Sequence, residues 1–148
     1  MATFDRPITK YADLKVGHVF PDEPVTFEVT AEVVDGYCES TRESSDFYKP
    51  GSTAGPGGKR PAPPTIAGIY MVDAVLTLPA APGGVHAKQK FTFHRPPCVG
   101  ETLYTSVEIV EKYQKKGRNY VVMATTTKNQ DGDLVTEGLM TRIWGKED

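Results

Sequence analysis

The second half of the chain contains four consecutive segments with the alternation of β-strands, joined by short connections. They are predicted at residues 85–95, 102–113, 119–128 and 134–144. The last two connections, QKKGR and NQDGD, are short and contain glycine, which is typical of hairpins between antiparallel strands. The sequence therefore predicts an antiparallel meander. In its first strand, counting in twos places Val85, Ala87, Phe91 and Phe93 on one face and His86, Lys88, Lys90, Thr92 and His94 on the other.

An apolar segment at residues 64–78 comes directly before these strands and is predicted to be a helix. Its apolar side chains fall on nearly every face, and a helix of that kind belongs in the centre of a fold. Asp73 is the exception, and we expect it either to point to the rim or to find a partner. A sheet that curls around one apolar helix is an α+β architecture.

The first third of the chain is less regular. We expect an irregular arm up to Pro24, a strand at residues 25–29, and a helix at about residues 31–40 whose first turn is capped by the hydroxyl of Thr30. A Gly/Pro-rich loop follows at about residues 49–63, and a loop of that length inside a compact domain is usually functional or disordered. The prediction is one domain, residues 1–148.

Composition excludes several classes of protein. The formal net charge of −2 and pI near 5.9 lack the basic footprint of a nucleic-acid-binding domain. No apolar stretch approaches the roughly 20 residues of a membrane span, and no signal-peptide pattern stands at the N-terminus, so we expect a cytoplasmic protein. Three histidines without a nearby thiol or carboxylate pattern predict no metal site.

Two stretches of the sequence resemble a known family. They are VHAKQKFTFHRPPCVGETLYTSVEIVEKYQKKGR and, after it, TKNQDGDLVTEG. Together with the order of elements, they resemble the MaoC-like dehydratases of the hot dog fold, in particular the N-terminal dehydratase half of fatty-acid-synthase-like MaoC proteins. The likeness extends from about Tyr11 to Trp144. It implies an antiparallel sheet wrapped around a central helix, and hydration or dehydration of an acyl thioester without a cofactor.

In active members of that family, an Asp followed five positions later by a His forms an acid/base pair, and an amide at the start of the central helix stabilises the thioester oxygen. On this chain the resemblance places Glu43 and Tyr48 at the pair and Pro64 at the amide. Tyrosine, with a pKa near 10, is a poor replacement for imidazole at neutral pH, and proline has no amide hydrogen. The resemblance therefore implies that the chain lacks its own Asp/His pair.

This pattern resembles the non-catalytic partner in heteromeric MaoC-like hydratases, which form part of a hydro-lyase complex. The implied partners are a second hot dog chain that brings the Asp/His pair, and an acyl-CoA or acyl-carrier thioester. Two alternatives stay open: a self-sufficient homodimeric enoyl-CoA hydratase that uses Glu43 and His94, and an acyl-CoA-binding module without turnover.

Substrate contacts follow from the same resemblance. Residues at the start and along the central helix are expected to line the acyl path: Pro64, Thr65, Ile66, Ile69 and Tyr70. For CoA phosphates, which arginine can bind bidentately, the candidates are Arg60, Arg95 and Arg118. The structural alternatives are core packing for the apolar residues, solvated charges for the arginines, and a strand-end structural role for His94.

Overall fold

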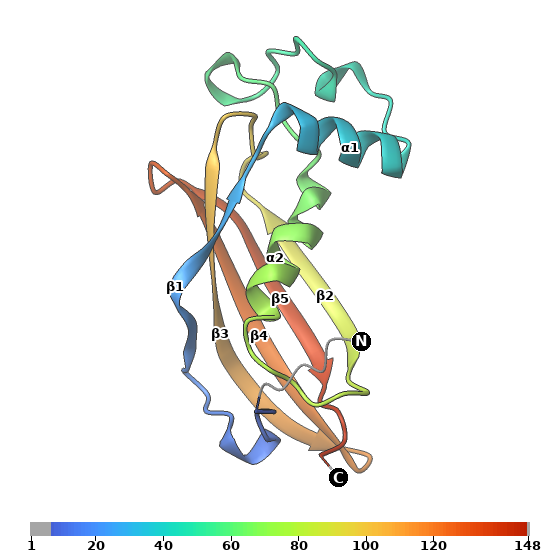
Figure 1. Ribbon diagram of the computed structural model, residues 1–148, viewed down its shortest axis with the longest axis vertical. Coiled ribbons are helices and arrows are strands. Elements are labelled where there is room, and N and C mark those ends of the chain that lie inside the picture. Colours follow the sequence, from blue (N-terminus) through green and yellow to red (C-terminus); the bar gives the residue numbers. More distant parts are fainter. Residues whose placement is uncertain (1–6, 148) are drawn as a thin grey trace.

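The computed structural model describes residues 7–147 as one antiparallel sheet with a helix across one face (Figure 1). The strands are β1 (Val19–Glu28), β2 (Val85–Phe93), β3 (Thr102–Lys115), β4 (Arg118–Asn129) and β5 (Leu134–Ile143). Their order across the sheet is β1-β3-β4-β5-β2, and every neighbouring pair is antiparallel. The predicted α+β architecture and the meander of β3, β4 and β5 are confirmed. The prediction that β2 begins this meander is wrong, because β2 pairs with β5 and not with β3.

Two α-helices and four short 3-10 turns complete the structure. The helices are α1 (Ala31–Thr41) and α2 (Ala67–Val75), and the turns are η1 (Tyr11–Asp13), η2 (Asp46–Tyr48), η3 (Pro56–Gly58) and η4 (Pro64–Ile66). The predicted cap of α1 is confirmed, because the hydroxyl of Thr30 accepts a hydrogen bond of 3.1 Å from the amide of Val33. The predicted central helix is divided into η4 and α2.

Helix α2 packs one side against the sheet and leaves the other uncovered. Its buried residues form the centre of the core: Ala67, Tyr70, Met71, Ala74 and Val75. The hydroxyl of Tyr70 lies 2.7 Å from that of Thr136 on β5, which satisfies a buried polar group. Ile69, Val72 and Leu76 are exposed by 43 %, 38 % and 60 %. The sequence predicted a helix buried on all sides, whereas a single chain covers only half of it.

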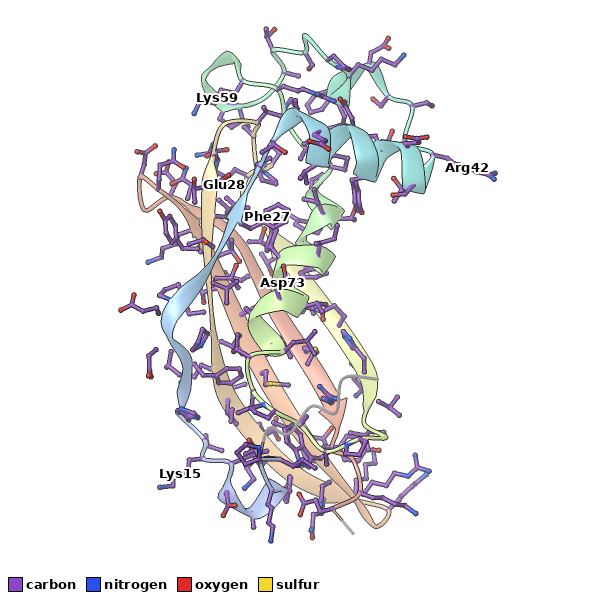
Figure 2. The ribbon with its side chains drawn as sticks, viewed as in Figure 1. Lys15, Phe27, Glu28, Arg42, Lys59 and Asp73 are labelled. Carbon is purple, nitrogen blue, oxygen red and sulfur yellow. The ribbon has the colours of Figure 1, made fainter. Side chains whose placement is uncertain are left out.

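Asp73 was expected either to point to the rim of the fold or to find a partner. It is exposed and lies on the side of α2 that faces away from the sheet (Figure 2). The carboxylate therefore points to the rim rather than to a partner in the core.

The predicted boundary of the first strand is wrong. Residues up to Pro24 were expected to be irregular, but β1 begins at Val19 and pairs with β3 on both sides of an irregularity between Phe20 and Val25. Pro21 and Pro24 lie in that irregularity. Because β1 is at the edge of the sheet, prolines without an amide hydrogen are tolerated there.

The predicted faces of β2 are also wrong in part. The pairing of β2 with β5 shifts by one residue between His86 and Lys88, so Ala87 is an extra residue in a bulge. His86 lies opposite Arg142 and lines a cavity beside α2, whereas Lys88 and Lys90 lie opposite Thr141 and Leu139 on the other face. His86 thus does not share a face with the lysines, and Val85 does not share one with Phe91.

No helix among residues 7–147 is long and apolar enough to cross a membrane.

Candidate functional site

The end of α1, the following loop and the start of η4 meet at one end of the molecule (Figure 1). Helix α1 ends at Thr41, where Arg42 adopts a left-handed conformation (φ 56°) and the amide of Glu43 donates a hydrogen bond of 2.8 Å to the carbonyl of Cys38. In Figure 2, Arg42 projects outward from this helix end and Lys59 marks the returning loop. After this chain reversal come both predicted acid/base positions, Glu43 just beyond α1 and Tyr48 at the end of η2.

Glu43 and Tyr48 lie close enough that the charge of Glu43 acts on the phenol of Tyr48. The Glu43 carboxylate is exposed and accepts a hydrogen bond of 3.0 Å from the amide of Ser45. Burial raises the pKa of Tyr48 above its usual value, and the charges of Glu43 and Cys38 raise it further. At neutral pH the phenol therefore keeps its proton, and it accepts none from water.

Arg60 fastens the Gly/Pro-rich loop to α1. Its guanidinium donates to the backbone carbonyl of Tyr48 at 2.9 Å and to the carboxylate of Asp35 at 2.6 Å. The side chain is only 10 % exposed. Arg60 thus already has two protein partners and acts in this structure as a clasp between the loop and the helix.

Cys38 lies in the same cluster and is not activated. Burial raises the pKa of its thiol, the charge of Arg60 opposes this, and the carboxylates of Glu43 and Asp35 raise it again. A thiol with a raised pKa is a poor nucleophile at neutral pH. Cys38 is instead a half-buried residue that packs against the hydrophobic core.

The start of the central helix offers no amide at the predicted position. Pro64 is the first residue of η4 and has no N–H. Beside it, the hydroxyl of Thr65 lies 2.7 Å from the hydroxyl of Tyr37 on α1. Sequence reasoning assigned Tyr37 only to the apolar stripe of α1; its phenol, which needs a partner when half-buried, was the signal that it also reaches the second element.

The predicted acyl-contact residues fall into two groups. Ile66 and Tyr70 are buried in the core, with exposures of 0 % and 1 %. Ile69 is exposed and is free to contact a ligand or a partner chain, as is Thr65 at the helix start.

Two cavities adjoin the exposed side of α2 further along. One, of about 220 Å³, is lined by Val72, Val75, Leu76, Gly84, His86, Met140 and Arg142. The other, of about 530 Å³, has a mainly apolar lining of Ile8, Leu76, Leu78, Pro79, Ala80, Pro82 and Arg142. Leu76 and Arg142 line both cavities, which therefore lie side by side at the C-terminal end of the helix.

His94 is engaged elsewhere. Its Nε2 lies 2.7 Å from the carboxylate of Glu137 on β5, and its backbone amide donates to Val135. No hydrogen bond among residues 7–147 connects it with Glu43 or Tyr48.

Arg95 belongs to an ionic network in which Glu101 is buried, Arg95 is partly buried and Asp133 is exposed. It donates to both carboxylate oxygens of Glu101, at 3.2 and 3.1 Å, and to Asp133 at 3.0 Å. Glu101 is 2 % exposed and also accepts from the amide of Cys98 and from Asn129. These bonds hold the connection between β2 and β3 against the turn between β4 and β5. Sequence reasoning did not single out Glu101, because nothing in its local pattern shows that it is buried.

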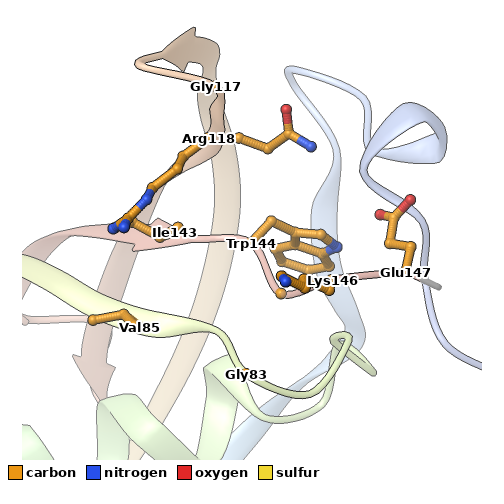
Figure 3. Close-up of a pocket in the computed structure, with 10 residues that line it drawn as sticks. Gly83, Val85, Gly117, Arg118, Ile143, Trp144, Lys146 and Glu147 are labelled. Atoms are coloured by element: carbon orange, nitrogen blue, oxygen red, sulfur yellow. The ribbon is translucent and has the colours of Figure 1, made fainter.

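Arg118 lies at the opposite end of the molecule from Arg60, on the hairpin between β3 and β4 (Figure 1). It borders a cavity of about 620 Å³ together with Trp144, Lys146 and Glu147 (Figure 3). The three arginines predicted to bind CoA phosphates therefore do not converge on one site. Among the residues that the structure describes, no group of three or more His, Cys, Asp or Glu side chains is arranged to hold a metal ion.

Known structures share this fold. The R-hydratase PhaJ1 of Pseudomonas aeruginosa, in its unliganded form, superposes with a TM-score of 0.78 at 24 % identity, over 93 % of this chain and 86 % of that one. The HadBC (3R-hydroxyacyl-ACP dehydratase) complex of Mycobacterium tuberculosis gives 0.73 at 24 % identity, over 86 % and 96 %. The ChsH1–ChsH2 complex of the same organism gives 0.67 at 16 % identity, over 84 % of each chain.

Sequence comparisons agree with the structural ones. A UPF0336 protein of Saccharopolyspora erythraea is 24 % identical over 137 residues, which span 86 % of this chain and 87 % of the relative. The family model described as "FAS1-like, dehydratase domain region" matches residues 15–138, which is most of the chain. This protein therefore belongs to the family described as FAS1-like, dehydratase domain region, and it has the hot dog fold of the similar hydratase structures.

Proposed function

We propose that this chain is the non-catalytic, acyl-thioester-binding subunit of a MaoC-like enoyl-CoA hydratase or 3-hydroxyacyl-thioester dehydratase. Its partner is a second hot dog chain that supplies the Asp/His pair. Hydration of an enoyl thioester joins the water oxygen to the β-carbon and a proton to the α-carbon. The group that takes the proton from water must exchange it at neutral pH, which favours imidazole and carboxylate over phenol.

One observation carries the proposal: Glu43, Tyr48 and Pro64 stand together at the end of the molecule where the catalytic groups are expected. The raised pKa of Tyr48 removes it as a base near neutral pH. Pro64 donates no hydrogen bond to a thioester oxygen. A catalytic chain would need an exchangeable pair and an oxyanion donor, and this chain alters both.

Two of the similar structures support a heteromeric assembly. HadBC and ChsH1–ChsH2 are both complexes of two different chains. By analogy, this chain contributes one half of a paired fold and the partner contributes the chemistry.

The uncovered side of α2 supports a role in acyl binding. Its apolar residues, Ile69, Val72 and Leu76, extend from near Thr65 to the two cavities at the end of the helix. At 1.5 Å per residue the distance from Thr65 to Leu76 is about 16 Å, which suits an extended acyl chain. In this proposal the partner covers that path, because an exposed apolar stripe is stabilised when it is removed from water.

The test is reconstitution. The chain is purified alone and together with a MaoC-like chain from the same genome that contains an intact D-x-N-P-x-H segment, and hydration of crotonyl-CoA and of a longer enoyl-CoA is measured. We expect turnover only in the pair, at the roughly 1–10³ per second of ordinary enzymes. Turnover at such a rate by the isolated chain would contradict the proposal.

Each alternative has its own readout. A self-sufficient homodimer would lose activity in the Glu43→Gln variant, whereas the proposed subunit has no activity of its own to lose. A binding module without turnover would bind acyl-CoA in calorimetry but stay inactive with every catalytic chain tested. In the proposed subunit, Glu43→Gln leaves the activity of the reconstituted pair unchanged.

A further inference from the structure

Strand β2 forms a free edge of the sheet. It is the last strand in the order β1-β3-β4-β5-β2 and is paired only with β5. Seven of its nine residues are exposed, and in Figure 1 no helix or strand within residues 7–147 lies on its outer side. A free edge presents unpaired amide and carbonyl groups, which makes it a template for another strand.

The side chains of this edge carry a single sign of charge. The strand VHAKQKFTF contains Lys88 and Lys90 and no Asp or Glu. After the bulge both lysines point to the face of the sheet opposite to α2, where their neighbours on β5 are Thr141 and Leu139. Neither lysine takes part in an ion pair within residues 7–147.

Apolar surface borders the same edge. Val85 and Phe93, near the two ends of the strand, are exposed by 51 % and 42 %. Val72 and Leu76 on α2 share a cavity with His86 of β2, so the uncovered side of the helix lies next to the edge. Lysines alone would suit an edge that is kept in water, but this apolar border favours an edge that is buried in a complex.

A second copy of this chain is a poor occupant. In any antiparallel register, pairing β2 with itself places each lysine opposite another lysine, a histidine or a neutral residue, and never opposite a carboxylate. Like charges directly opposite each other on paired strands are destabilising, and opposite charges are stabilising. Self-pairing therefore gains no pair of opposite charges in any register, and it is disfavoured in each register that places the lysines opposite each other.

We propose that the occupant of the β2 edge is a strand of a different chain that carries carboxylates opposite Lys88 and Lys90, and that these two lysines select it over a second copy. The proposal refines the heteromeric assembly proposed above by stating the charge of the partner strand. It also applies to a hot dog partner that binds no thioester.

A charge-reversed copy of the same chain provides the acidic strand for the test. Wild-type protein and a tagged Lys88→Glu/Lys90→Glu variant are studied alone and as a 1:1 mixture by sedimentation velocity at low and high salt. We expect the mixed dimer to be at least about ten-fold tighter than either homodimer at low salt. Added salt should weaken the mixed dimer and strengthen the wild-type one, because it screens attraction in the first and repulsion in the second.

Two further variants serve as controls. Lys115→Glu/Lys116→Glu makes the same change in net charge outside β2, on the hairpin between β3 and β4, and its mixture with wild type should show no such gain. Lys88→Gln/Lys90→Gln removes the repulsion without adding attraction and should self-associate more tightly than wild type. Thermal unfolding of each protein alone establishes that all are folded, which is expected because the four lysines are exposed.

The proposal is overturned if the mixture stays monomeric, since β2 would then not pair even with a strand of opposite charge. It is overturned equally if wild type forms a dimer whose affinity is unchanged by charge reversal. Neither result involves a thioester, so the reconstitution of hydration tests the proposed function separately. Inactivity of every pair, together with a tight mixed dimer, would refute the proposed function and leave this inference standing.

Discussion

At the scale of single residues, the carboxylate of Glu101 has the most demanding environment. It is almost completely buried, and Arg95, Asn129 and the amide of Cys98 together satisfy its oxygens. Breaking a buried ion pair leaves an uncompensated charge in a medium that solvates it poorly. Glu101 therefore acts as the tie between two connections of the sheet.

We expect Glu101→Gln to lower the free energy of unfolding by about 3 kcal/mol, because Arg95 loses its buried partner. Urea denaturation measures the change. The matched control is Asp46→Asn, which removes an exposed ion pair with Lys49 and should leave the midpoint unchanged. Equal effects of the two substitutions would contradict the structural role assigned to Glu101.

Tyr70 gives the chain a dependence of stability on alkaline pH. Burial raises the pKa of its phenol to about 12, with the hydrogen bond to Thr136 acting in the opposite direction. The ordinary value is 10.0, so the unfolded chain ionises first. The stability that depends on neutral Tyr70 is complete below pH 10 and is lost as the pH rises towards 12.

A shift of about two pKa units corresponds to a loss of about 2 to 3 kcal/mol across that interval. We expect Tyr70→Phe to show a correspondingly smaller loss of stability between pH 9 and 12 than wild type, measured by urea denaturation at each pH. Tyr104→Phe, at an exposed tyrosine, is the control. Parallel curves for all three proteins would show that Tyr70 ionises freely in the folded state.

At the scale of elements, sequence patterns predicted most of the fold because they report local periodicity. The helix cap at Thr30 depends on a residue three positions further on, and the meander of β3, β4 and β5 depends on the short connections between successive strands. The errors arose where a tertiary context overrides the pattern. Pro21 and Pro24 indicated a loop, but prolines are tolerated in an edge strand such as β1. In β2, the extra residue Ala87 moves the side chains before it to the opposite face of the sheet from the one that strict alternation predicts.

The site was predictable to a similar extent. The resemblance located the end of α1 and the start of the central helix, and Glu43, Tyr48 and Pro64 do lie at one end of the molecule. Two contacts hold helix α1 against this part of the chain. One joins Tyr37 to Thr65 and the other joins Asp35 to Arg60, pairs that are 28 and 25 positions apart in the sequence. No local period contains such pairs, so only the folded chain reveals them.

The clasp made by Arg60 is testable as a property of the loop. We expect Arg60→Ala to speed tryptic cleavage after Lys59 several-fold, because the loop loses its bonds to Tyr48 and Asp35 and opens more often. Timed digestion with mass analysis follows the cleavage. Asp35→Ala should have a smaller effect, and Arg118→Ala none. Unchanged cleavage in Arg60→Ala would show that the loop is held by other contacts.

At the scale of the whole molecule, α2 has two apolar sides with different tasks. The side with Ile66 and Tyr70 stabilises the isolated chain, whereas Ile69, Val72 and Leu76 remain in water until something covers them. A monomer gains little from three exposed apolar residues on one stripe, next to a free sheet edge. In the proposed assembly a partner covers this stripe, so the two sides of α2 should respond differently to substitution.

Two substitutions on this helix segment separate those tasks. Ile66→Ala removes fully buried methyl groups and should lower the free energy of unfolding of the isolated chain by about 2 to 5 kcal/mol. Ile69→Asp changes an exposed residue and should alter that stability by no more than about 0.5 kcal/mol.

In the reconstituted pair, however, Ile69→Asp should reduce hydration of a long enoyl-CoA at least about ten-fold, because a carboxylate would be buried in the acyl path. Crotonyl-CoA, whose chain is too short to extend far along the helix, should be affected less. If Ile69→Asp reduces both substrates equally and also lowers the affinity of the two chains, the stripe is a contact between subunits, and the acyl chain takes another path.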